Sequence, residues 1–231
     1  VAEIDRLIHK YPTETRYRIL RGDIYLQQKQ TQKAFDVYSQ VLREDPSNPY
    51  IYVSLSDYYS TVNEPDKAIG AIVTALKSDQ LVVDEKLNIL SQYIQKLISD
   101  TTRLDENESL FKLLTERYPF EEKVHEYYAQ FLGFRNRNAE AIQEYETIIS
   151  INPRNENAWI QIAQNLVREQ KFDDMLRTVD RAIQSNPESS FLYFYKGIAE
   201  FQLDQMEPAL DSYKKSAQFV KPEQALFKSD I

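Results

Sequence analysis

Apolar side chains recur at intervals of three and four residues along the chain, and this spacing predicts α-helices. One run comprises Leu87, Leu90, Tyr93, Ile94, Leu97 and Ile98. The stretch FLYFYKGIAEF, residues 191–201, has five aromatic residues in eleven positions, which is enough apolar surface for two stripes. A helix needs only one apolar stripe to pack against its neighbours, so the pattern raises the question of what the second stripe faces.

The prolines divide the chain into repeats. Six of the nine prolines lie 34, 73, 34, 34 and 35 residues apart, namely Pro12, Pro46, Pro119, Pro153, Pro187 and Pro222. The interval of 73 residues combines one unit of 34, in which Gln80 replaces the proline, with one unit of 39. Proline disfavours helix in the residue before it, so each of these prolines is expected to end one helix and to begin the next unit.

Small residues recur at two fixed places in the unit. Those at position 8 are Gly22, Ser56, Ala129, Ala163 and Gly197, and those at position 20 are Ala34, Ala68, Ala141 and Ala209. Two helices approach closely only where side chains are small, so we expect position 8 of a first helix to lie against position 20 of the second helix. In one unit Met175 replaces the alanine.

This pattern resembles the tetratricopeptide repeat, a helix-turn-helix unit of 34 residues with aromatic residues at fixed positions and a proline near its end. The matching residues include Tyr25, Tyr38, Pro46, Trp159, Ala163, Ala182 and Pro187. The resemblance implies an all-α fold, in which antiparallel helix pairs stack into a solenoid that winds as a right-handed superhelix. The first helix of each pair would line the concave side. Trp159 is expected to be buried between its own second helix and a neighbouring unit.

The repeat phase predicts a single solenoid over residues 1–231, cut from a longer array. Its complete units are 15–48, 49–82, 83–121, 122–155, 156–189 and 190–223. A half repeat at 1–14 supplies only a second helix, and 224–231 begins another unit. The five extra residues of the irregular unit 83–121 are expected to lengthen its first helix by about one turn. Its acidic run DENE is expected to begin the second helix, with Asp105 and Glu108 as a capping pair.

Charge and composition disfavour several classes of partner. With 28 Lys and Arg against 36 Asp and Glu, the net charge of −8 should repel a nucleic-acid backbone. The chain has no cysteine, which removes disulfides, thiolate metal sites and thiol nucleophiles. No apolar run approaches the roughly 18 residues of a transmembrane helix, so no membrane insertion is predicted for these residues.

No catalytic chemistry is predicted. His9 and His125 lie in different units and are each expected at the surface, so a shared metal or an acid–base pair is not expected. Four scattered glycines do not form a phosphate-binding loop. The chain is therefore predicted not to be an enzyme, and neither a metal nor a cofactor is predicted.

The resemblance implies that positions 2, 5, 9 and 12 of each first helix line a concave groove. The candidate partner-binding residues at these positions are Tyr50, Val53, Asp57, Asn157, Ile160, Gln164, Phe191, Phe194, Ile198 and Phe201. The last four form the second stripe of the aromatic stretch, and a partner segment is expected to dock against them. The alternative is that further repeats cover them. The groove positions do not match the two-carboxylate clamp of chaperone-binding members of the family.

We therefore predict a non-catalytic scaffold that binds a protein or peptide segment in its concave groove. Two alternatives stay open, namely the repeat arm of a larger enzyme or assembly factor and a module that self-associates end to end. Stretches such as YRILRGDIYLQQKQ also resemble the long arrays of Bacteroides-type bacterial envelope and lipoprotein-like proteins. That resemblance implies a location in the periplasm or cell envelope, with the cytoplasm as the alternative.

Overall fold

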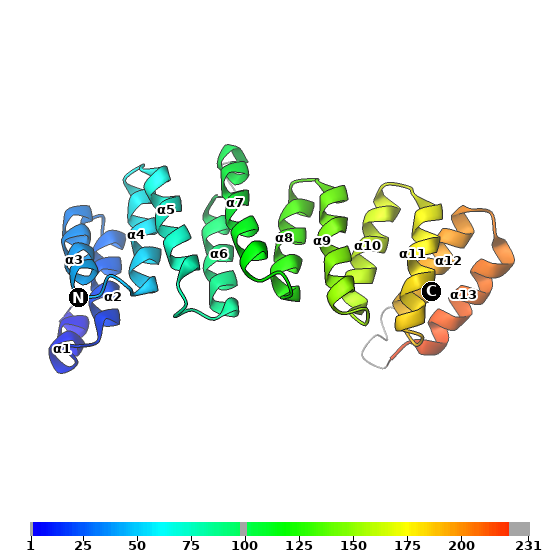
Figure 1. The fold of residues 1–231 in the computed structure, drawn as a ribbon, viewed down its shortest axis with the longest axis horizontal. Helices are drawn as coiled ribbons and strands as arrows, with labels where there is room; N and C mark the ends of the chain where they lie inside the picture. The colour runs from blue at the N-terminus through cyan, green and yellow to red at the C-terminus, as the bar shows by residue number, and fades with distance from the viewer. Residues whose placement is uncertain (1, 98–100, 222–231) are drawn as a thin grey trace. The chain divides into compact units, whose positions relative to one another are not determined.

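The computed structural model describes residues 2–97 and 101–221, and it describes the side chains of 3–96 and 107–221. Within these residues the chain forms thirteen α-helices and no β-strand (Figure 1). This confirms the all-α fold class. The chain divides into two compact units, Val1–Leu114 and Thr115–Ile231, and each unit is described by itself. None of the described helices combines the length and the apolar character needed to span a membrane.

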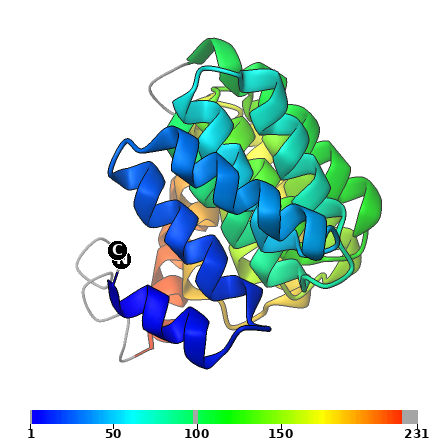
Figure 2. The same cartoon turned by 90° about the vertical axis from the view of Figure 1, so that its left-hand side faces the viewer.

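The first unit contains one single helix followed by helix pairs. The single helix is α1 (Ala2–Lys10), and the pairs are α2 (Thr15–Gln27) with α3 (Thr31–Glu44), α4 (Pro49–Thr61) with α5 (Pro65–Lys77), and α6 (Val83–Leu97) with α7 (Thr101–Arg117). The last residues of α7 belong to the second unit. Figure 2 shows α2 and α3, in blue, packed side by side.

The second unit contains three regular helix pairs. They are α8 (Glu122–Phe134) with α9 (Asn138–Ile151), α10 (Glu156–Arg168) with α11 (Phe172–Ser185), and α12 (Ser190–Gln202) with α13 (Met206–Phe219). In all three pairs the first helix has 13 residues and the second has 14. Each pair lies within one 34-residue interval of the repeat phase.

A residue with left-handed backbone conformation makes the turn inside each regular pair. These residues are Lys29, Asn63, Asn136, Gln170 and Asp204, with φ between 56° and 60°. All five stand two residues before the second helix begins. Left-handed conformation is uncommon for residues other than glycine, and Asn and Asp adopt it most readily. It reverses the chain within a three-residue turn, so the second helix returns antiparallel to the first.

The start of several first helices is fixed by a capping side chain. Asn48, Asn155 and Ser189 each stand two residues after a repeat proline. Their side chains accept hydrogen bonds from the backbone N–H groups of Tyr50, Ala158 and Leu192, at 3.0, 3.0 and 3.1 Å. These bonds satisfy N–H groups that have no partner inside the helix.

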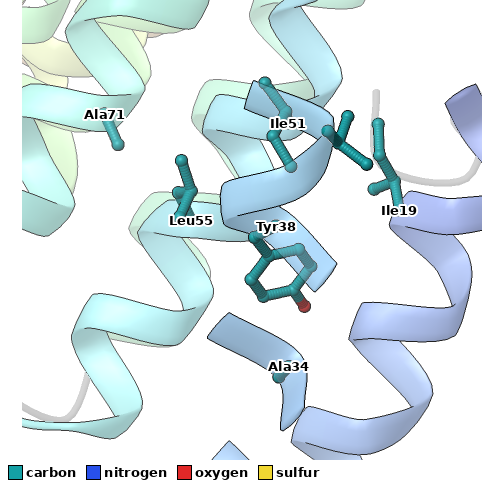
Figure 3. Close-up of a cluster of buried hydrophobic side chains, with 7 residues drawn as sticks. Ile19, Ala34, Tyr38, Ile51, Leu55 and Ala71 are labelled. Atoms are coloured by element: carbon teal, nitrogen blue, oxygen red, sulfur yellow. The ribbon is translucent and has the colours of Figure 1, made fainter. Parts of the chain in front are cut away.

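The core of the first unit lies where α2, α3, α4 and α5 meet (Figure 3). It consists of Ile19, Ala34, Tyr38, Val41, Ile51, Leu55 and Ala71. A Cβ atom at Gly22 would lie 2.3 Å from Cε1 of Tyr38, and one at Gly197 would lie 2.7 Å from Cε1 of Tyr213. In both repeats the ring at position 24 of the second helix therefore packs against the glycine at position 8.

The residue at position 4 ties several units to the proline that precedes them. The hydroxyl of Tyr52 donates to the carbonyl oxygen of Pro46 at 2.8 Å, and Nε1 of Trp159 donates to that of Pro153 at 2.9 Å. Trp159 is only 3% exposed, which confirms its expected burial. The guanidinium of Arg181, on α11, lies 5.3 Å from the indole centroid. The indole is thus held by its own second helix and by the end of the preceding unit.

The irregular unit 83–121 has longer helices than the regular pairs, and one expectation for it is wrong. α6 has 15 residues, two more than α2, and α7 has 17, three more than α3. Both helices are thus longer than their counterparts in the first complete pair, and since residues 98–100 lie outside the described residues, the expected full extra turn of the first helix stays a prediction. The capping interpretation of Asp105 is wrong, because α7 begins at Thr101. Glu108 is buried inside this helix, and its carboxylate pairs with Nζ of Lys112 at 2.9 Å.

Candidate partner-binding surface

The first helices of the first unit present mixed chemistry at the predicted groove positions. Tyr50 is 49% exposed, and its hydroxyl donates a hydrogen bond to Oε1 of Glu85, on α6, at 3.0 Å. This bond raises the pKa of Tyr50, so the phenol stays protonated. Val53 and Asp57 are half-buried and follow at three and seven residues along α4, on the same face of the helix.

A hollow of about 420 Å³ lies where α2, α4 and α6 end. It is lined by Leu26, Gln27, Asp57, Ser60, Thr61 and Lys96. Nζ of Lys96 donates a hydrogen bond to Oδ1 of Asp57 at 2.6 Å, which links α6 to α4. The lining residues come from the first helices of three successive pairs, so these helices share one surface. Glu85 and Lys96 stand outside positions 2, 5, 9 and 12, which is why the repeat pattern did not identify them.

Asp23 connects this surface to the core of the unit. The hydroxyl of Tyr38 donates a hydrogen bond to its Oδ1 at 2.8 Å. Burial raises the pKa of Asp23, the hydrogen bonds from Tyr38 and Ser54 oppose that rise, and the neighbouring charge of Asp57 adds to it.

In the second unit the predicted positions on α10 carry amide and apolar side chains. Asn157 is exposed, and its Nδ2 donates to Oε1 of Glu126, on α8, at 3.3 Å. Nε2 of the half-buried Gln164 donates to the hydroxyl of Tyr195, on α12, at 3.0 Å. Ile160, which lies between these two residues in the sequence of α10, is half-buried. These bonds join α8, α10 and α12, so the first helices of the second unit also share a surface. Tyr195 stands at position 6 and was missed for that reason.

The four residues of the aromatic stripe on α12 differ in solvent exposure. Phe191, Phe194 and Ile198 are half-buried, whereas Phe201 is 50% exposed. The ring centroid of Phe194 lies 5.8 Å from that of Tyr195 and 6.0 Å from that of Tyr213, on α13. Phe194 therefore takes part in the packing of α12 against α13, and Phe201 offers the largest open surface of the stripe.

The two histidines have different surroundings. His9 is exposed, but the expectation that His125 lies at the surface is wrong, because it is only 6% exposed. Its Nδ1 lies 2.7 Å from Oε2 of Glu144, and its Nε2 lies 3.1 Å from the carbonyl oxygen of Pro119. Burial acts to lower the pKa of His125, but the bonds to Glu144 and Pro119 raise that pKa above its ordinary value. In the part of the chain that the structure describes, no three acidic or histidine side chains gather into a group that could hold a metal ion.

Comparison with known proteins supports the repeat family. A family model for the tetratricopeptide repeat matches residues 1–49. The chain is 20% identical over 230 residues to the mitochondrial import receptor subunit TOM70 of Homo sapiens, a match that covers 96% of this chain and 38% of that protein. It is also 23% identical over 208 residues to the DnaJ homolog subfamily C member 7 homolog of Dictyostelium discoideum. That match covers 82% of this chain and 37% of that protein. The chain thus spans little more than a third of the length of these relatives.

Comparison with solved structures finds matches to a chain described as MamA MSR-1 C2 and to a protein named YrrB. MamA MSR-1 C2 is 16% identical, with a TM-score of 0.48, and the match covers 74% of this chain and 95% of that chain. YrrB is described as a TPR protein with an unusual peptide-binding site. It is 13% identical with a TM-score of 0.41, and the match covers 99% of this chain and 98% of that chain. The helix pairs give the chain an all-α fold in the described residues, and the tetratricopeptide-repeat model matches its first 49 residues. The resemblance to Bacteroides-type envelope arrays is not confirmed and stays a prediction.

Proposed function

We propose that the chain is a non-catalytic scaffold that binds a segment of a partner protein along the surfaces formed by its first helices. Solenoids of this kind generally use such surfaces for protein–protein interaction. The observation that carries the proposal is the exposure of Tyr50 and Phe201, two large aromatic side chains that stand at predicted groove positions and are each about half open to solvent. Aromatic side chains are enriched among the residues that dominate binding energy at protein interfaces.

The relatives support a binding role and no more than that. TOM70 is named as a subunit of an import receptor. Since the chain spans little more than a third of that protein, the proposal is limited to a binding surface. The repeat arm of a larger enzyme and an end-to-end assembly module stay alternatives, and the test below separates the second of these from partner binding.

The test uses Phe201 as the probe, because Phe194 also packs against Tyr213 and its replacement would disturb the fold. A photo-reactive phenylalanine analogue at position 201 is crosslinked in an extract of the source cells, and the attached segment is sequenced. The isolated segment is then titrated against the unmodified chain and the Phe201→Gln variant. Loss of an aromatic anchor should weaken binding by roughly tenfold or more, while the melting temperature stays nearly unchanged.

Leu210→Gln is the matched control, because Leu210 is 56% exposed but lies on α13, a second helix. It should leave the affinity unchanged. Equal weakening in both variants, or in neither, would show that the surface of the first helices is not the binding site. If the crosslinked segment comes from another copy of this chain and the mass in sedimentation rises with concentration, self-association replaces the proposal.

A further inference from the structure

A second hollow, of about 260 Å³, lies between α8, α9 and α10 in the second unit. It is lined by Ala129, Gln130, Gly133, Ala141, Tyr145, Gln161, Asn165 and Arg168. Gly133 keeps it open, because a Cβ atom built on this residue would meet no other atom within 4 Å. The equivalent residue of the first complete repeat is Leu26. Gln130 and Gly133 stand at positions 9 and 12 of α8, so the hollow adjoins the predicted groove.

Tyr145 lines the hollow. The residue as a whole is only 4% exposed, and its hydroxyl forms no hydrogen bond with another described residue. Tyr38 occupies the equivalent position of the first complete repeat, and there the hydroxyl donates to Asp23 at 2.8 Å. The residue that corresponds to Asp23 is Gln130, whose Nε2 is directed to Oε1 of Glu126 at 3.4 Å. A phenolic O–H without a partner in the chain can donate to an acceptor placed in the hollow.

The guanidinium of Arg168 lies at the hollow and can also donate hydrogen bonds to a ligand. Arg168 is exposed, and among the described residues no carboxylate lies within ion-pair distance of it. Its Nη1 makes one long contact, of 3.4 Å, to Oδ1 of the buried Asn165. Burial raises the pKa of Tyr145, Glu126 adds to the rise and Arg168 opposes it, so the phenol keeps its proton at neutral pH. Tyr145 and Arg168 therefore both offer donors to the same space.

We propose that this hollow receives the side-chain carboxylate of an aspartate or glutamate in a bound segment. A carboxylate can accept from the guanidinium and from the phenol together, and it supplies the counter-charge that Arg168 lacks. α8 and α10 border the hollow on two sides, so a segment that lies along the groove continues past it, which favours a side chain over a chain end. This inference rests on the proposed scaffold function and names one feature of the partner. The two donors, Tyr145 and Arg168, stand outside the groove positions 2, 5, 9 and 12.

The test titrates the chain with the amide of N-acetyl-aspartate and follows the N–H signals of Gly133 and of the Arg168 side chain by nuclear magnetic resonance. The amide of N-acetyl-asparagine is the neutral probe of the same shape, and N-acetylglycine supplies a terminal carboxylate. The aspartate probe should cause saturable shifts at both signals, and the asparagine probe should not. Arg168→Gln should weaken binding of the aspartate probe by roughly tenfold.

Two glycine variants provide the steric test. Gly133→Leu fills the hollow with the residue found at the equivalent place in 15–48, and it should abolish the shift at Arg168 without lowering the melting temperature. Gly70→Leu is the control, because a Cβ atom at Gly70, on α5, also meets nothing within 4 Å. It should leave binding unchanged. The proposal is overturned by equal shifts with the asparagine probe, by shifts spread over other exposed Lys and Arg residues, by unaltered binding in Gly133→Leu, or by tighter binding of N-acetylglycine.

The outcome is independent of the test of the scaffold function. Phe201→Gln should leave the aspartate probe bound, since Phe201 does not line the hollow. If the probe fails to bind while the partner segment still depends on Phe201, only the hollow is excluded. If the probe binds and Phe201→Gln has no effect on the partner, only the groove on α12 is excluded.

Discussion

The repeats 15–48 and 122–155 place a tyrosine at the same position and use it differently. Tyr38 is fully buried, its ring fills the space left by Gly22, and its hydroxyl is bonded to Asp23. Tyr145 is nearly as buried, but its hydroxyl has no partner among the described residues and lines a hollow. The difference comes from the facing first helix. Asp23 is replaced by Gln130 in the second repeat, and Leu26 by Gly133.

This comparison shows that the helix pair and its surface are controlled by separate positions. The small residue at position 8 decides how closely the two helices approach. Positions 9 and 12 supply the side chains of the neighbouring surface, which are Asp23 and Leu26 in one repeat and Gln130 and Gly133 in the other.

The largest expected effect concerns the helix that closes one side of the hollow. α10 supplies Gln161, Asn165 and Arg168 to the hollow, and Trp159 anchors this helix. Trp159→Ala removes a buried indole and should lower the free energy of unfolding by about 3 to 5 kcal/mol, measured by urea denaturation. Trp159→Phe keeps most of the volume and should cost much less. A cost below about 1 kcal/mol for the alanine variant would contradict the assigned register.

The second prediction contrasts the two kinds of glycine. Gly22→Ala puts a methyl group against the ring of Tyr38 and should destabilise the fold by about 3 kcal/mol. Gly133→Ala meets no neighbour and should stabilise the helix by about 0.5 to 1 kcal/mol, because alanine is the better helix former. Thermal and urea unfolding of the two variants measure the difference. If both substitutions lowered the free energy of unfolding, or both raised it, the hollow beside Gly133 would not be open space.

The third prediction removes one hydroxyl from each tyrosine. Tyr38→Phe breaks a hydrogen bond to a half-buried carboxylate and should cost about 1.5 kcal/mol. Tyr145→Phe removes a hydroxyl that has no partner and should change stability by less than about 0.5 kcal/mol. Both free energies come from the same denaturation series. If Tyr145→Phe were the more costly change, its hydroxyl would have to be bonded inside the chain.

The repeat period allowed the helices to be predicted from the sequence, because five regular units repeat the same signals. Gly22 and Trp159 were recognised as packing residues for that reason. The ion pair of Lys96 with Asp57 was not predictable, since Lys96 lies in the irregular unit, whose register the period does not fix. The hollow at Gly133 was missed because it results from a side chain that is absent.

His125 shows a signal that was present and overlooked. It stands at position 4 of its unit, where Tyr52 and Trp159 stand in theirs, and its Nε2 lies against the proline carbonyl just as their donors do. The equivalence would have predicted burial. Histidine was taken as a surface residue on its polarity alone, although a polar side chain is readily buried when both of its polar atoms find partners.

The smallest expected effect is a dependence on pH in the repeat that carries the hollow. Of the three described side chains at position 4 that contact a proline carbonyl, His125 is the one that titrates near neutral pH. Its pKa in the folded chain is raised by Glu144 and Pro119 in spite of burial. The stabilisation is therefore complete below the ordinary histidine pKa of about 6.5 and is lost as pH rises through the higher pKa of the folded state.

Urea denaturation between pH 5.5 and 8.5 tests this sign in the unmodified chain and two variants. The free energy of unfolding should fall with rising pH in the unmodified chain. His125→Gln removes the titrating group, and Glu144→Gln removes the charge that favours the imidazolium, so both variants should show a weaker dependence. The dependence in Tyr38→Phe should match that of the unmodified chain, because Tyr38 lies in another repeat. A parallel decline in the unmodified chain and in His125→Gln would assign the pH effect to other groups.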